Sequence, residues 1–120
     1  MLRVAVPIDG TLAEPTAAVL RAAGYRQRAD DRVLSLADEI NDVEFYYLQA
    51  RDIPTFVGSG DLHFGITGSD VMDESTSGVH AVVDLGYGQC EFRIAVPAGS
   101  GWTLDDLDGR TIATCYPRLV

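Results

Sequence analysis

The chain has no lysine: its nine basic residues are all arginines, and they stand against 18 acidic residues, for a formal net charge of −9. A nucleic-acid surface needs a basic face that displaces counterions from phosphates, so this balance argues against nucleic acid as a partner. A nucleotide ligand stays open, because nucleotides usually arrive with Mg²⁺ and a few local donors are enough to hold a phosphate.

Cysteine and histidine are scarce, with two of each in 120 residues. Cys90 and Cys115 lie far apart in the sequence, which favours two buried thiols in a reducing compartment. His63 and His80 stand alone, so we expect structural or surface roles for them and no metal site. The sequence also offers no Ser/His/Asp or Cys/His arrangement for nucleophilic catalysis.

Long apolar runs are absent too, since no stretch approaches the roughly 18 residues that cross a membrane. The first residues, MLRVAVP, lack the parts of a signal peptide and predict a strand instead. We therefore expect a cytoplasmic protein without membrane contact. An apolar content of 47% is enough for a core, and 120 residues fit one domain, or one domain and a piece of another.

The most informative stretch is Asp52–Asp70, DIPTFVGSGDLHFGITGSD. It predicts a helix that Asp52 caps and that Gly58–Gly60 ends, because glycine accepts the left-handed conformation of a helix stop. The alternation of apolar and polar residues over 62–66 then predicts a short strand with one apolar face.

The residues Thr67–Asp70 open a second helix directly at the carboxyl end of that strand. Ligands in open α/β sheets bind at this end, where free amides and the positive helix end meet an anion. Two interpretations of Asp70 stay open. It contacts a ligand, or it caps the helix, since Thr67-x-x-Asp70 resembles a capping box.

A similar unit begins the chain, with a predicted strand over Leu2–Val6, a turn that includes Gly10, and a helix over Thr11–Ala23. Such a strand–glycine turn–helix unit either binds an anion or only connects the two elements. We expect the amides of the Gly10 turn and of Gly65–Asp70 to converge on one nucleotide-sized hollow.

The remaining segments carry weaker sequence patterns. Residues 25–42 are rich in both charges and predict a solvated edge, with one short strand near 33–36. Residues 98–101 have the composition of a hinge. Further predicted elements are strands over Val43–Leu48, Val79–Leu85, Glu91–Val96 and Arg110–Thr114, and a short helix over Trp102–Leu107 that Thr103 caps.

Several blocks together resemble ATP phosphoribosyltransferase, the first enzyme of histidine biosynthesis. They are DIPTFVGSGDLHFGITGSD, LRVAVP before it, and LGYGQCEFRIAVP and LDGRTIATCYPRLV after it, in the family's order and over almost the whole chain. The resemblance implies an α/β, periplasmic-binding-protein-like fold of two lobes, of which mainly the first is present. Residues 1–97 would form the first lobe, and residues 98–120 the hinge and the start of a truncated second lobe.

The resemblance also implies an activity. The family is a glycosyltransferase that transfers phosphoribosyl from phosphoribosyl pyrophosphate to N1 of ATP, with Mg²⁺ on the substrate phosphates, and it works as homo-oligomers from dimers to hexamers. Its loop for phosphoribosyl pyrophosphate lies beyond residue 120. We therefore expect the amino-terminal part of such an enzyme, inactive as a 120-residue chain.

Carried over by resemblance, one set of residues would bind the nucleotide: Gly10, Gly68, Ser69, Asp70, Cys90 and Tyr116. Asp70 would contact ribose or adenine, and Tyr116 would stack on adenine. Cys90 would lie near the nucleotide or pack in the core. Arg51 would contact a phosphate, and no residue is assigned a catalytic role.

Three departures from the family's pattern motivate alternatives. Asp9 stands where the family has lysine, Gln49 where it has arginine, and Arg118 where it has asparagine. One alternative is a diverged, non-catalytic paralogue that binds a nucleotide or another small ligand. Another is a plain ligand-binding lobe of the periplasmic type, against which the missing signal peptide counts.

Overall fold

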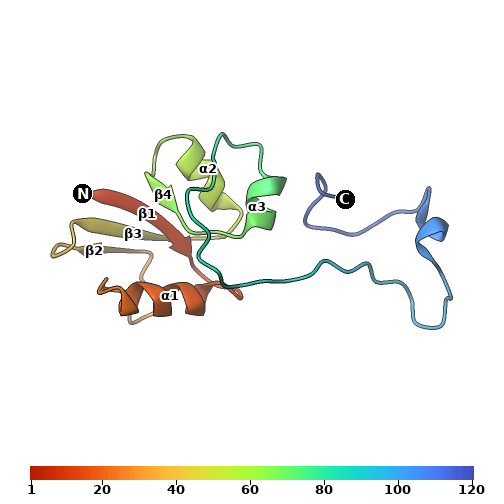
Figure 1. Ribbon diagram of the computed structural model, residues 1–120, viewed down its shortest axis with the longest axis horizontal. Helices are drawn as coiled ribbons and strands as arrows, with labels where there is room; N and C mark the ends of the chain where they lie inside the picture. Colours follow the sequence, from red (N-terminus) through yellow and green to blue (C-terminus); the bar gives the residue numbers. More distant parts are fainter. The chain divides into compact units, whose positions relative to one another are not determined.

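The computed structural model describes residues 1–120 and divides the chain into two units, Met1–Gly88 and Gln89–Val120. The first unit holds the sheet and its helices, whereas the second holds one short 3₁₀ helix, η1 (Leu104–Leu107) (Figure 1). No helix in either unit has the length and apolar content needed to cross a membrane. The lobe boundary at residue 97 stays a prediction.

The sheet has four strands in the order β2-β3-β1-β4. β1 (Leu2–Pro7) lies in the middle and runs parallel to β3 (Val43–Leu48) and to β4 (Phe64–Gly65), whereas β2 (Ser35–Asp38) pairs antiparallel with β3. The strands predicted over 2–6 and 43–48 are confirmed. Because β1, β3 and β4 are parallel, their carboxyl ends lie at one edge of the sheet.

Helices cover both faces of the sheet (Figure 1). α1 (Ala13–Ala22) lies on one face, and α2 (Asp52–Gly58) and α3 (Ser69–Glu74) lie on the other. Side chains alternate along each strand, so the strands supply two cores. The α1 side holds the buried residues Val6, Val43, Phe45 and Tyr47, and the α2 side holds Ala5, Ile53 and Leu62.

The stretch around α2 follows the prediction in outline. Gly60 has a φ of +87°, which confirms that glycine ends this helix in the left-handed conformation. Asp52 is the first helical residue and not the cap, a position that Arg51 occupies without a side-chain hydrogen bond. The capping role predicted for Asp52 is therefore wrong.

The strand predicted over 62–66 is reduced to the two residues of β4. Leu62 packs in the α2-side core, whereas Ile66 packs against the α1-side core, so the shared apolar face predicted for these residues is wrong. The amide of Leu62 donates to the carbonyl of Phe56 in α2 at 3.1 Å, which draws residue 62 out of the ladder.

Three predicted strands do not form: Val79–Leu85, Glu91–Val96 and Arg110–Thr114 have no strand structure. Their apolar side chains stay exposed, as Val82, Phe92 and Ile112 illustrate. A branched and aromatic pattern becomes a strand only where a neighbouring strand accepts its backbone hydrogen bonds, and none pairs with these segments here.

Two predictions about the later part of the chain had opposite outcomes. The short helix after Trp102 forms as η1, and the Asp106 carboxylate accepts hydrogen bonds from the Thr103 amide and hydroxyl, at 2.7 and 3.1 Å. The prediction of two buried thiols is wrong, because Cys90 and Cys115 are both exposed and free.

Candidate functional site

The Gly10 turn and the segment from Ile66 to Asp70 leave the sheet at the same edge. Pro7 ends β1, and the parallel pairing of Ala5 with Gly65 carries β4 to its end beside it. The Ile66 amide donates to the Ala5 carbonyl at 3.0 Å, so the second segment starts against β1. These two backbone segments therefore lie at the same carboxyl edge of the sheet, whereas their convergence on a nucleotide-sized hollow stays a prediction.

Gly10 gives the first segment its shape, with a φ of +83° that favours glycine over other residues. The Gly10 carbonyl accepts from the Ala13 amide at 3.3 Å, and α1 begins there. Asp9 and Gly10 are both exposed, so solvent reaches the turn from the edge of the sheet.

Gly68 precedes α3 as its cap residue and has no side chain to cap the helix. The Thr67 hydroxyl donates to the Ala50 carbonyl at 3.4 Å, so Thr67 is not the cap residue that the capping-box interpretation requires. The Asp70 carboxylate lies directly against Gly68, where any larger residue would collide with it. Ser69 is exposed and Asp70 is half-buried.

Leu12 occupies space between two glycines of the first unit. A Cβ added at Gly68 would lie 3.7 Å from Leu12 Cδ1, and one added at Gly88 would collide with Leu12 Cδ2. A leucine side chain therefore fills part of the region where the nucleotide-sized hollow was expected. Of the two cavities described below, one is lined by residues that flank the Gly10 turn, among them Pro7, Ile8 and Ala13, and the other lies on the α2 side of the sheet.

The other predicted site residues divide between the two units. Arg51 is exposed and follows β3, whose carboxyl end lies at the same edge as that of β1. Cys90 and Tyr116 belong to the second unit. The Tyr116 ring packs edge-on against Phe92 with 5.1 Å between ring centroids. Their roles toward a nucleotide stay predictions.

Sequence reasoning missed Arg28, which it assigned to a solvated edge. The Arg28 side chain is only 11% exposed and lines a cavity of 290 Å³ between α1, the end of β1 and residues 27–31. No sequence signal separates this arginine from Arg26 and Arg32 nearby, because all three stand among acidic residues without periodicity.

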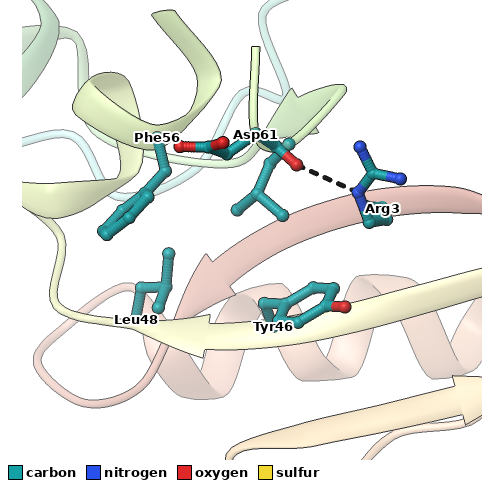
Figure 2. Close-up of a pocket in the computed structure, with 6 residues that line it drawn as sticks. Arg3, Tyr46, Leu48, Phe56 and Asp61 are labelled. Carbon is teal, nitrogen blue, oxygen red and sulfur yellow. Dashed lines mark hydrogen bonds between the residues drawn. The ribbon is translucent and has the colours of Figure 1, made fainter. Parts of the chain in front are cut away.

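A second cavity, of 270 Å³, lies on the α2 side of the sheet and is largely apolar. Figure 2 shows Arg3 from β1 reaching the backbone oxygen of Asp61, a hydrogen bond of 2.9 Å, while Tyr46, Leu48 and Phe56 line the rest. It contains none of the predicted site residues.

The second cavity also holds a perturbed phenol. The Tyr46 hydroxyl donates to the Glu44 carboxylate, and this hydrogen bond, with burial second, raises the pKa of Tyr46. The phenol therefore keeps its proton to higher pH than an isolated tyrosine does.

Comparison with known proteins decides the family. The sequence model of ATP phosphoribosyltransferase matches residues 49–120, more than half of the chain. The chain belongs to the ATP phosphoribosyltransferase family. Relatives with that name share 55% identity in Salinispora tropica and 51% in Mycobacterium tuberculosis, each over all 120 residues.

The chain spans about two-fifths of the length of these ATP phosphoribosyltransferase relatives, 43% and 42% respectively. A solved structure, the ATP phosphoribosyl transferase (HisG:HisZ) complex from Thermotoga maritima, matches 67% of this chain and 38% of its own. The TM-score is 0.54 at 23% identity, which supports the periplasmic-binding-protein-like α/β fold expected from the sequence.

Proposed function

We propose that the chain is the amino-terminal part of an ATP phosphoribosyltransferase that joins the ribose of phosphoribosyl pyrophosphate to N1 of ATP in histidine biosynthesis. The observation that carries this proposal is the identity of 51–55% over all 120 residues with curated enzymes of that name. Loss of pyrophosphate gives the ribose anomeric carbon oxocarbenium character, so such an enzyme needs positioning and charge stabilisation more than a nucleophile.

The nucleotide would bind at the carboxyl edge of the sheet. The backbone at Gly10 and at Gly68–Asp70 meets this edge, and Arg51 follows β3 there. Asp70 would accept hydrogen bonds from ribose or adenine. Cys90 and Tyr116 are also proposed to contact the nucleotide, as the family resemblance implies, with the Tyr116 ring against adenine.

Mg²⁺ would come with the substrate phosphates. The chain gathers no group of three or more His, Cys, Asp or Glu side chains that could hold an ion. Phosphate oxygens and water would therefore supply most of the ligands, as is common for Mg²⁺. We also propose a cytoplasmic homo-oligomer, from dimer to hexamer, that binds neither nucleic acid nor membrane.

The test compares the complete encoded protein with the chain Met1–Val120, measuring ATP-dependent release of pyrophosphate from phosphoribosyl pyrophosphate. We expect the complete protein to be active and the 120-residue chain to be inactive, because the family's phosphoribosyl pyrophosphate loop lies beyond residue 120. Turnover by the chain alone would contradict the second expectation, and an inactive complete protein would contradict the first.

A second candidate is a non-catalytic paralogue that binds a nucleotide or another small ligand. Asp9 favours it, because an exposed carboxylate beside the Gly10 turn would repel a phosphate. Calorimetry of the complete protein with ATP, AMP and amino acids separates the two candidates. Binding without turnover supports the paralogue, whereas turnover excludes it.

A further inference from the structure

The guanidinium of Arg28 makes three hydrogen bonds to backbone carbonyls and a cation–π contact. Its Nη2 donates to the Ile8 carbonyl at 2.6 Å, and its Nη1 donates to the carbonyls of Asp31 and Val33 at 2.9 and 3.1 Å. Its guanidinium carbon lies 4.4 Å from the centre of the Tyr47 ring. The planar guanidinium reaches these acceptors from two separate nitrogens in a fixed fork, whereas the donors of an ammonium all radiate from one atom.

Hydrogen bonds to Tyr47 also fix the backbone around Arg28. The Arg28 amide donates to the Tyr47 hydroxyl at 3.0 Å, and that hydroxyl donates to Gln27 Oε1 at 3.1 Å. Tyr47 is itself only 5% exposed within β3. Arg28 therefore projects from a support fixed to the centre of the sheet.

The target of Arg28 is the residue just before the Gly10 turn. Ile8 has both backbone groups held, since its amide donates to the Leu48 carbonyl at 2.8 Å and its carbonyl accepts from Arg28. A peptide group is planar, so the Ile8 carbonyl and the Asp9 amide share one plane and point in opposite directions. By holding that carbonyl, Arg28 sets the direction of the Asp9 amide.

The positive charge of the Arg28 guanidinium also bears on the Gly10 turn. Arg28 pairs with the carboxylate of Asp31 at 3.9 Å, and because Asp31 is fully exposed, solvent screens that pair. The Arg28 side chain is itself only 11% exposed and its Nη2 lies 2.6 Å from the Ile8 carbonyl, so its positive charge lies next to the Gly10 turn with little exposure to solvent.

We propose that Arg28 is a positioning residue for the nucleotide: through the Ile8 carbonyl it orients the Gly10 turn and supplies the positive charge behind it. The inference rests on the proposed function, because it assumes that a nucleotide phosphate meets this turn.

The first experiment measures ATP·Mg²⁺ affinity of the complete protein by calorimetry for Arg28→Gln and Arg28→Lys. We expect Arg28→Gln to raise Kd by about tenfold or more, since small misplacements of binding groups are costly. The Kd of Arg28→Lys should lie between those of Arg28→Gln and the wild type, because lysine keeps the charge but not the three hydrogen bonds. Arg26→Gln is the matched control, because Arg26 is exposed and bonds Asp38 through its backbone amide; its Kd should not change.

Arg28 could affect Kd only by stabilising the fold, and Leu62→Ala is the control for that effect. It lowers stability by removing a buried side chain on the α2 side, away from Arg28. This variant should lower the unfolding temperature and leave Kd unchanged where the protein is folded. Amide chemical shifts give a readout free of ligand. Arg28→Lys should move the resonances of Asp9 and Gly10 and leave those of α2 in place.

The outcomes separate the inference from the proposed function. A wild type that does not bind ATP overturns both. A wild type that binds, with Arg28→Gln binding equally well, overturns the inference alone. If Arg28→Gln does not fold, Arg28→Lys decides: unchanged Asp9 and Gly10 resonances, or a loss of affinity matched by Leu62→Ala, overturns the inference.

Discussion

The hydroxyl of Tyr87 lies 2.7 Å from Oγ1 of Thr16, a hydrogen bond between residues 71 positions apart. Thr16 is buried in α1, with 1% of its surface exposed. The contact holds the segment around Tyr87 against the first turns of α1, where Leu12 also meets the backbone of Gly88. Tyr87 and Gly88, which follow the last strand in sequence, therefore pack against the amino-terminal end of α1.

Tyr87→Phe should lower the free energy of unfolding by about 1 kcal/mol, because the buried Thr16 hydroxyl loses its partner. Urea denaturation of the chain measures this change. Thr16→Val should cost a similar amount, and the double variant should cost less than the sum of the two. Additive costs would show that the hydrogen bond does not contribute.

Gly65→Ala should destabilise the first unit by about 1–3 kcal/mol, the usual range for overpacking. A Cβ at residue 65 would collide with Ile53 Cγ2 and lie 3.1 Å from Val57 Cγ2, both in α2. Gly78→Ala is the control, since nothing lies within 4 Å of its added Cβ and its φ is not positive. Equal denaturation midpoints for the two variants would contradict the prediction.

Asp38 should make the fold sensitive to acid. The Arg26 amide, and after it the Asn41 side chain, hold the pKa of Asp38 below its usual 3.8. A lowered folded-state pKa gives stability that is fully present above the unfolded-state pKa and is lost as pH falls through the folded-state pKa. Urea denaturation at a series of pH values should therefore show wild type losing stability below about pH 4.

Asp38→Asn is the control for that series. It should be less stable than wild type at neutral pH, and the difference should shrink as the pH falls. A difference that stays constant with pH would show that the charge of Asp38 does not contribute.

Asp9→Lys should strengthen ATP binding by the complete protein by about tenfold, since it replaces an anion by a cation beside the proposed phosphate position. Glu39→Lys changes the net charge equally at an exposed residue directly after β2. Calorimetry at two salt concentrations compares them. An equal gain from Glu39→Lys would assign the effect to the overall charge and not to the Gly10 turn.

Sequence reasoning succeeded where the signal was local. The apolar and aromatic content of Val43–Leu48 located a strand, and the glycines at Gly58–Gly60 located a helix end. The same reasoning brought Gly10 and Gly68 to one edge, because parallel strands follow from strand–helix–strand order.

Local sequence patterns do not reveal which residues distant in the chain a segment will contact. Glu91–Val96 has the composition of a strand, yet strand structure depends on a neighbour elsewhere in the chain. Unlike Arg26, Arg28 contacts the Ile8 carbonyl and the Tyr47 ring, which are distant in sequence. The residues next to these positions predict neither the missing strand partner nor the contacts of Arg28.

The central place of β1 has a consequence for biosynthesis. Leu2–Pro7 is synthesised well before its partners Val43–Leu48 and Phe64–Gly65, so its backbone hydrogen bonds stay unpaired until they are made. The antiparallel pair of β2 and β3 is closer in sequence and can form earlier. We therefore expect the nascent apolar segment LRVAV to be accessible to chaperones until residue 65 has been made.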